Sequence, residues 1–379
     1  MRTIVKEKNS SLGYSFPFEG EKHLATLIIL PYREDTWRES ALPALEEYLS
    51  LVKAISQFER VVIIIDPRIS YQTVKNFQLP NVTILRLYSD NSWARDTLPV
   101  FLKDQKDDLL GVDFGFNSWG GDFNGLYKPW DLDNAIGRKV LLELKIPRLA
   151  EKDFILEGGS IHTDGEGTLL TTSECLLSKG RNPNLTQSQI EDELEKTLNI
   201  QKVLFLPFGI YEDETSGHVD NIACFLKPGT VLLSWTDDKN DPQYDRSLKD
   251  LEYLESVTDA KGRKLEIIRM PLPSVQYLSD KEASGIKIDG KAIERKGGRR
   301  LAASYVNFYM GQDFIILPQF HDAMDEKAVT ILDSFYQGKK KIIPLYSREI
   351  LLGGGNLHCV TKQVPYSDLY EVEPKENEK

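Results

Sequence analysis

A short run of β-branched residues and leucines recurs along the chain, and this repeat constrains the fold more than any other feature. The runs, of which the second is the weakest, are Thr26–Pro31, Thr97–Leu102, Thr168–Thr172, Thr230–Trp235 and Asp313–Pro318. Neighbouring runs lie roughly 60 to 85 residues apart, about a fifth of the chain. The spacing therefore predicts five similar structural units within the 379 residues.

A second set of apolar runs predicts another strand in most units: Val61–Asp66, Lys202–Pro207, Lys264–Arg269 and Lys341–Leu345. Apolar residues at helical spacing precede two of them, over Leu42–Phe58 and Ser188–Leu198, and Thr186 begins a helix N-cap signal. Repeated strand–helix–strand units indicate an α/β fold, and short apolar runs suit strands covered on both faces. Periodicity alone leaves open a doubly wound sheet with decorated loops.

The composition is that of a soluble globular protein, with 41% hydrophobic and 28% charged residues. The formal net charge of -11 argues against nucleic acid and anionic membranes as partners, because both require clustered Lys and Arg. The charge suits a small cationic ligand, although it also serves solubility alone. No Gly/Ser-rich or Pro-rich linker divides the chain. We therefore predict one domain over residues 1–370 and a charged, disordered tail over 371–379.

The cysteines are few, and no C-x-x-C pattern is present: the three are Cys175, Cys224 and Cys359. This count predicts neither a disulfide framework nor a zinc ribbon. The N-terminal residues lack the pattern of a signal peptide, and no apolar run approaches the ~20 residues of a membrane helix. We expect a cytoplasmic protein in which Cys359 persists as a free thiol.

The segment Gly353-Gly-Gly-Asn-Leu-His-Cys359 is the first candidate for chemistry. Three glycines, including Gly353 and Gly354, allow unusual backbone conformations and close approach of a ligand. A cysteine just beyond them is well placed to be an exposed nucleophile. The alternative for a lone cysteine is a small buried hydrophobe. That alternative is favoured for Cys175 and Cys224, which lie in apolar, strand-like contexts.

The segment Gly217-His-Val-Asp220 is the second candidate. In a strand, His218 and Asp220 would point to the same face, which would set an acid/base beside a carboxylate. The alternative is a loop histidine hydrogen-bonded to its neighbour. In an extended segment, His358 would point away from Cys359. The remaining histidines are also weaker candidates: His23, His162 and His321.

Two further segments, Ser92–Asp96 and Leu156–Ser160, place a carboxylate beside unusual neighbours. Carboxylates hold a planar guanidinium through forked, paired hydrogen bonds, so Asp96, Glu157 and Asp220 suit such a substrate. Trp93 and Trp119 would stack on the cation or its alkyl chain, with core packing as the equal alternative. The sequence contains no Walker, dinucleotide-binding, H-E-x-x-H or EF-hand motif. We expect no cofactor and no metal.

These motifs resemble those of the agmatine deiminases, in the bacterial peptidylarginine-deiminase-like branch of the guanidino-group-modifying (pentein) enzymes. The segments that carry the resemblance stand in the same order: Trp93–Asp96, Glu157–Thr168, Gly217–Asp220 and Gly353–Cys359. Similarity extends from about Asp90 to Pro365 and includes the segment Ala303–Phe308. Several separate motifs in order make the resemblance specific.

The resemblance implies a five-bladed, pseudo-fivefold α/β propeller of ββαβ units that assembles as a dimer or higher homo-oligomer. It implies hydrolysis of agmatine to N-carbamoylputrescine and ammonia through a covalent cysteine thiouronium. By motif match, Cys359 is the nucleophile and His218 the acid/base. Asp96 and Asp220 grip the guanidinium, and Glu157 orients it beside the histidine.

One segment departs from the family pattern. Where agmatine deiminases usually carry W-x-x-W-P, this chain reads Leu27-Ile-Ile-Leu30-Pro31. We expect this strand to line or support the far end of the pocket, so the departure affects substrate identity more than reaction type. The alternatives are deimination of another guanidino compound such as free or peptidyl arginine, a non-catalytic guanidinium-binding protein, and a cysteine protease.

Overall fold

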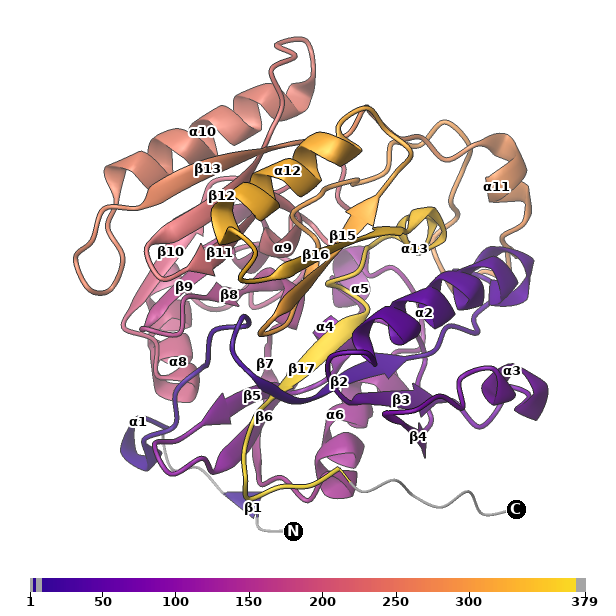
Figure 1. The fold of residues 1–379 in the computed structure, drawn as a ribbon, viewed down its shortest axis with the longest axis horizontal. Helices are drawn as coiled ribbons and strands as arrows, with labels where there is room; N and C mark the ends of the chain where they lie inside the picture. The colour runs from indigo at the N-terminus through magenta and orange to yellow at the C-terminus, as the bar shows by residue number, and fades with distance from the viewer. Residues whose placement is uncertain (1–2, 5–8, 373–379) are drawn as a thin grey trace.

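The computed structural model describes residues 3–4 and 9–372, and within these residues the strands form five small sheets (Figure 1). Each sheet contains one antiparallel pair followed by a parallel pair joined through a helix. In one unit, β11 (Ala223–Lys227) pairs antiparallel with β12 (Thr230–Trp235), and α10 (Pro242–Ser256) leads to β13 (Glu266–Pro271), parallel to β12. The repeated unit is therefore ββαβ.

Three other units follow the same order. One contains β5 (Val100–Lys103), β6 (Leu109–Gly115), α6 (Asp131–Glu143) and β7 (Arg148–Ile155), with β1 (Thr3–Ile4) at its edge. The next contains β8 (His162–Thr163), β9 (Thr168–Thr172), α8 (Gln187–Leu198) and β10 (Lys202–Leu206). The last contains β14 (Tyr309–Met310), β15 (Phe314–Gln319), α12 (Asp325–Tyr336) and β16 (Lys341–Tyr346).

The fifth sheet joins the two ends of the chain. Its antiparallel pair is β17 (Thr361–Pro365) with β2 (His23–Ile29), and α2 (Leu42–Ile55) leads from β2 to the parallel strand β3 (Val61–Ile65). A further parallel strand, β4 (Val82–Arg86), lies at the edge. The last strand of the chain thus supplies the first strand of the first unit and closes the ring, which confirms the five-unit α/β propeller.

The four stronger repeats coincide with the central strands β2, β9, β12 and β15. The assignment of the weak repeat at 97–102 as their counterpart was wrong, because it covers β5, the antiparallel strand. The central strand of that unit is β6. Its apolar run is interrupted by Gly111, Gly115 and the buried Asp113, which pairs with Arg148. A doubly wound sheet is excluded because the strands form separate sheets.

The central strands are buried on both faces, since helices cover the outer side and the middle of the ring covers the inner side. In the neighbouring strand β3 all five residues are buried, and alternate ones (61, 63 and 65) share a hydrophobic cluster with Tyr48, Leu51 and Val52 of α2. The other two, Val62 and Ile64, pack in a different cluster. Short helices lie in the connections: α1 (Asn9–Leu12), η1 (Arg38–Ala41), α3 (Tyr71–Lys75), α5 (Gly121–Asn124), α7 (Ser173–Leu176) and α11 (Asp280–Ser284).

Among the described residues, no helix combines the length and the apolar character that crossing a bilayer requires. The predicted tail falls largely outside the described part of the chain, which ends at Val372. That residue is buried, and its carbonyl accepts a hydrogen bond from the Arg60 guanidinium.

The capping signal ahead of α8 gives a test of the local structure. Thr186 Oγ1 accepts a hydrogen bond from Gln189 N at 3.3 Å, and Gln189 Oε1 accepts from Thr186 N at 2.9 Å. Thr186→Ala should lower the free energy of unfolding by about 1 kcal/mol, measured by chemical denaturation. Ser188→Ala, at an exposed site on the same helix, is the control and should not destabilise. Equal effects of the two changes would contradict the cap.

Candidate active site

The predicted catalytic side chains come from connections in different units. Asp96 lies in α4 (Ala94–Thr97), and Glu157 directly precedes η2 (Gly158–Ser160). His218 is the N-cap of α9 (Val219–Ile222), which carries Asp220. Cys359 lies in a turn between α13 (Arg348–Leu352) and β17. The structure brings all five together as buried residues.

The thiol of Cys359 is held by side chains of two other segments. It donates to Asp220 Oδ2 at 3.5 Å, and the Asn307 amide donates to the sulfur at 3.2 Å. Burial and the negative charges of Asp220 and Asp96 raise the pKa of the Cys359 thiol well above its ordinary value. In the free protein, the sulfur therefore carries its proton at neutral pH.

The carboxylate of Asp96 is oriented by two hydrogen bonds. Its Oδ1 accepts from Gly159 N at 2.8 Å, and its Oδ2 accepts from the Trp119 indole at 2.9 Å. Burial raises the pKa of Asp96 above its ordinary value, although the nearby His218 opposes this. Trp119 thus acts on the carboxylate through a hydrogen bond as well as through packing.

His218 and Glu157 form an ion pair that a buried arginine extends. His218 Nε2 lies 3.7 Å from Glu157 Oε2, and Arg181 Nε lies 2.9 Å from Glu157 Oε1. Burial would raise the pKa of Glu157, but the charges of Arg181 and His218 lower it to about 2. Burial would lower the pKa of His218, but Asp96 and contacts with Cys175 and Glu157 raise it well above its ordinary value. The resting pair is therefore an imidazolium beside a carboxylate.

Three buried polar atoms of the cluster have no hydrogen-bond partner among the described residues: Glu157 Oε1, His218 Nε2 and Asp220 Oδ1. The first two lie in ion pairs, with Arg181 and Glu157, whereas Asp220 Oδ1 does not. Unsatisfied buried polar atoms cost about 1–3 kcal/mol each, so such atoms in a functional site indicate where a ligand binds. A carboxylate oxygen requires a donor. A planar cation with several N–H groups meets that requirement and balances the negative charge of Asp96 and Asp220.

A cavity of about 430 Å³ reaches Cys359 and Asp96 from the surface. Its wall includes Trp93, Trp119 and the glycines 353–355. Gly354 has φ +109, and a Cβ there would lie 2.6 Å from Glu214 Oε2. A Cβ at Gly355 would lie 3.1 Å from Cys359 Sγ. Larger residues at these positions would therefore fill the path to the thiol.

Not every predicted residue lines this cavity. His218, Asp220 and Glu157 lie behind it, around Gly159. A Cβ at Gly159 would lie 2.7 Å from His218 Nδ1 and 2.9 Å from Asp220 Oδ2. This glycine therefore leaves the space in which the imidazole and the carboxylate approach each other.

Two local predictions were wrong. His218 and Asp220 begin helix α9 and do not alternate along a strand, yet both side chains approach Gly159. His358 does not point away from Cys359, because the segment is a turn and not an extended strand. His358 Nδ1 lies 2.9 Å from Asp220 Oδ2, the oxygen that also accepts from the Cys359 thiol.

The two leucines that replace family tryptophans do not line the cavity. Leu27 and Leu30 have no exposed surface and pack in two different hydrophobic clusters. Leu30 shares its cluster with Trp37 and Trp93, whose rings stack with centroids 5.3 Å apart. Leu30 therefore belongs to the same hydrophobic cluster as the cavity residue Trp93, Leu27 belongs to another cluster, and neither leucine forms the cavity surface.

Several residues that surround the site were not among the site residues predicted from the sequence: Glu19, Arg181, Glu214, Arg295 and Asn307. Asn307 lies within Ala303–Phe308, one of the segments that carry the family resemblance, and Glu214 lies four residues before His218. These two positions lie in or near motifs that the sequence analysis had singled out. Arg181 lies near no such motif, and only folding brings it against Glu157.

Two groups of side chains have the composition of a metal site: Glu19 with His162 and His358, and Glu157 with Cys175 and His218. In each group an arginine already pairs with the carboxylate, Arg95 at 2.8 Å from Glu19 and Arg181 at 2.9 Å from Glu157. The fixed positive charge opposes a second cation there.

Comparison with known proteins agrees with this geometry. The model of the Porphyromonas-type peptidyl-arginine deiminase family matches residues 15–365. A putative agmatine deiminase of Latilactobacillus sakei is 46% identical over 93% of this chain and 96% of its own length. The agmatine deiminase of Pseudomonas aeruginosa is 44% identical over the same shares. The solved agmatine deiminase of Enterococcus faecalis superposes with a TM-score of 0.93 at 36% identity, covering 96% of this chain and 99% of its own.

The closed ring of ββαβ units, with a cysteine, a histidine and carboxylates gathered at its centre, defines an amidine hydrolase of the guanidino-group-modifying superfamily. Within that class, the chain belongs to the Porphyromonas-type peptidyl-arginine deiminase family.

The raised pKa of Cys359 predicts how the free thiol reacts. Because only the thiolate is a nucleophile, alkylation by iodoacetamide should be slow at pH 7 and should increase with pH. Its midpoint should lie above the ordinary thiol pKa of about 8.5. Mass spectrometry should place the adduct on Cys359, and Cys359→Ala is the control. A midpoint below that ordinary value would contradict the electrostatic account.

Proposed function

We propose that the protein hydrolyses agmatine to N-carbamoylputrescine and ammonia, with Cys359 as the covalent nucleophile. The observation that carries the proposal is the thiol of Cys359 in contact with Asp220, beside Asp96, at the inner end of the cavity. A guanidinium between these carboxylates would lie against the sulfur. The names of the relatives from L. sakei, P. aeruginosa and E. faecalis support agmatine as the substrate.

Substrate binding would activate the nucleophile. The negative charges of Asp220 and Asp96 keep the Cys359 proton in place in the free protein. A bound guanidinium neutralises this field, so the pKa of the thiol falls when the electrophilic carbon arrives. The thiol then releases its proton to solvent, so the reactive thiolate forms chiefly in the presence of its substrate.

The chemistry then proceeds in two halves. The Cys359 thiolate attacks the central guanidinium carbon, and the protonated His218 delivers its proton to the departing nitrogen, which leaves as ammonia. Water attacks the remaining thiouronium, and His218 accepts one of its protons. The C–S bond then breaks, and the proton of the new hydroxyl passes to the departing sulfur, which restores the thiol and releases the carbamoyl product. Glu157, held by Arg181, stabilises the imidazolium and keeps its ring in place. The fixed carboxylates favour the cationic intermediates in a site shielded from water.

The mouth of the cavity distinguishes agmatine from arginine, which carries an additional carboxylate. Arg295 is the only cationic residue among the described residues that line the cavity. Its Nε and Nη2 donate to Glu214 at 2.9 and 2.6 Å, and its Nη1 donates to the Thr36 carbonyl at 3.3 Å. Its forked edge is therefore occupied and is not available to a substrate carboxylate. Glu214 is in turn neutralised, because Arg299 Nη1 lies 2.8 Å from its Oε1.

The first test is a panel of guanidino compounds scored for ammonia release. Agmatine should give sustained release, whereas free arginine and a peptidyl-arginine substrate should give little, because the cationic residue that lines the cavity, Arg295, is already engaged and cannot bind their carboxylate or peptide. Cys359→Ala should abolish turnover. Release from arginine but not from agmatine would refute the substrate, and substantial turnover by Cys359→Ala would refute the nucleophile.

A second test measures agmatine binding by calorimetry in the Cys359→Ala background, where no turnover occurs. Adding Asp220→Asn should weaken binding by about 3–5 kcal/mol, because it removes one member of a buried ion pair. This is more than about a hundredfold in Kd. Asp192→Asn, an exposed position on α8, is the matched control. Unchanged affinity after Asp220→Asn would contradict its role.

A further inference from the structure

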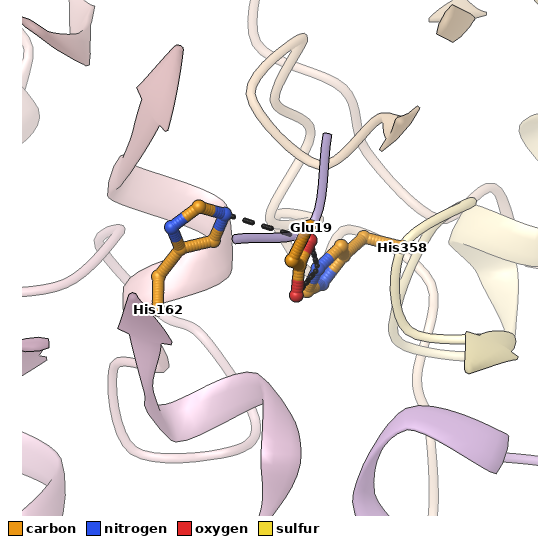
Figure 2. Close-up of side chains that lie close together, drawn as sticks. All are labelled: Glu19, His162 and His358. Atoms are coloured by element: carbon orange, nitrogen blue, oxygen red, sulfur yellow. Dashed lines mark hydrogen bonds and ion pairs between the residues drawn. The ribbon is translucent and has the colours of Figure 1, made fainter. Parts of the chain in front are cut away.

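Glu19, His162 and His358 form a buried cluster directly behind the active site, and the catalytic steps above do not use it. Figure 2 shows Glu19 between the two imidazoles. His358 Nε2 lies 2.9 Å from Glu19 Oε2, whereas His162 Nε2 lies 3.5 Å from the same oxygen. Arg95 Nη1 donates to the other oxygen of Glu19 at 2.8 Å. The carboxylate is thus held by cationic or polar groups on several sides.

His358 connects this cluster to the substrate-binding carboxylate. Its Nδ1 lies 2.9 Å from Asp220 Oδ2, and its Nε2 faces Glu19. A ring nitrogen must carry a proton to donate to a carboxylate, so contacts on both sides require the doubly protonated imidazolium. His162 differs, because its Nδ1 accepts a hydrogen bond from Phe225 N at 3.3 Å. His162 therefore reaches Glu19 without reaching Asp220.

The contact with His358 determines which oxygen of Asp220 remains available. Oδ2 is engaged by His358 and by the Cys359 thiol, whereas Oδ1 is buried without a partner. The imidazolium therefore holds the carboxylate in one orientation, with a single oxygen left for a donor from the substrate. It also places a positive charge beside a carboxylate that has to be ionised to bind a cation.

We propose that His358, itself held by Glu19, is a positioning residue that keeps Asp220 ionised and oriented for the guanidinium. This inference rests on the proposed function, since it assigns a role within the same reaction. His358 is not among the residues that line the cavity, and its imidazole reaches the site through Asp220.

The electrostatics of the cluster agree with this role. Burial would raise the pKa of Asp220, but the hydrogen bond and charge of His358 hold it below its ordinary value. Burial and Arg95 would lower the pKa of His358, but Glu19 and Asp220 raise it. Charged or titratable groups act on Asp220 from every surrounding element: Arg95 and Asp96 of α4, Asp213 and His218 before α9, Cys224 of β11, and His358 and Cys359 of the last turn.

Removing His358 should change the pH dependence of kcat/KM in one direction. Asp220 binds the cation only when it is ionised, that is, above its lowered pKa. Without His358, burial dominates and the pKa of Asp220 rises. The acidic limb of kcat/KM reports both substrate-binding carboxylates of the free enzyme, Asp220 and Asp96, of which Asp96 has the raised pKa. The limb moves to higher pH when the pKa of Asp220 rises to that of Asp96 or above it. A role limited to packing would lower kcat/KM at every pH and leave the limb where it is.

Two variants at one position separate the contacts of His358. In His358→Asn the side-chain amide stands near the place of Nδ1 and keeps a donor toward Asp220. In His358→Gln it stands near Nε2 and keeps a donor toward Glu19 alone. The acidic limb should move upward by about one pH unit in His358→Gln, about tenfold in kcat/KM on that limb, mostly through KM. His358→Asn should show a smaller shift.

Two further variants test whether a shift comes from the contact between His358 and Asp220. His162→Asn removes a contact with Glu19 but not with Asp220, and should leave the limb at the parent position. Glu19→Gln should shift the limb in the same direction as His358→Gln, because it removes the charge that favours the imidazolium. If both His358 variants have melting temperatures well below that of the parent, the shift is tested with Glu19→Gln alone. Unshifted limbs in the folded variants overturn the inference.

The proposed function is tested separately by the parent enzyme. Failure of the parent to release ammonia from agmatine refutes that function whatever the variants do. The limb is then measured with the guanidino compound that the parent does hydrolyse. If the parent hydrolyses agmatine and the variants have the same acidic limb of kcat/KM as the parent, only the role of His358 is refuted.

Discussion

The pairing of β17 with β2 is the interaction on which the rest of the structure depends. It joins the last strand of the chain to the first sheet and closes the ring of five units (Figure 1). The turn immediately before β17 carries Cys359, whose carbonyl accepts a hydrogen bond from Arg95 N at 3.1 Å. The strand pairing that closes the ring therefore also places Cys359 against α4.

The centre of the ring collects an unusual density of buried charge. Each carboxylate has a cationic or donating neighbour: Arg95 at Glu19, Arg181 at Glu157, His358 at Asp220 and Trp119 at Asp96. Buried charges survive only when paired and hydrogen-bonded, which explains why the second layer is so complete. Among the described carboxylates of the site, Asp220 Oδ1 has neither a hydrogen-bond partner nor an ion-pair neighbour, whereas Glu157 Oε1 at least faces Arg181. The paired neighbours offset the cost of burying these charges, and the unpartnered oxygen of Asp220 is left to accept a hydrogen bond from a cation.

Local patterns in the sequence anticipated much of this architecture. Apolar runs covered on both faces identified β2, β9, β12 and β15, and the Thr186 box identified the start of α8. The pattern failed at β6, where Asp113 is buried against Arg148. Hydrophobic periodicity does not register a buried ion pair, because its partner lies in another strand. The turn at His358 was misread for a similar reason, since its conformation depends on contacts with Asn307 and Asp220.

Residue types and their order along the chain were enough to predict the five-unit plan and the family and to select the candidate reactive groups. Each of these depends on features local in sequence, such as a glycine run before a cysteine or a histidine two residues from an aspartate. Which groups touch, which carboxylates are ionised and which oxygen stays free emerged only from the folded chain. Those properties depend on distances between residues such as Glu19, Asp220 and His358, hundreds of positions apart, and on the loss of water around them.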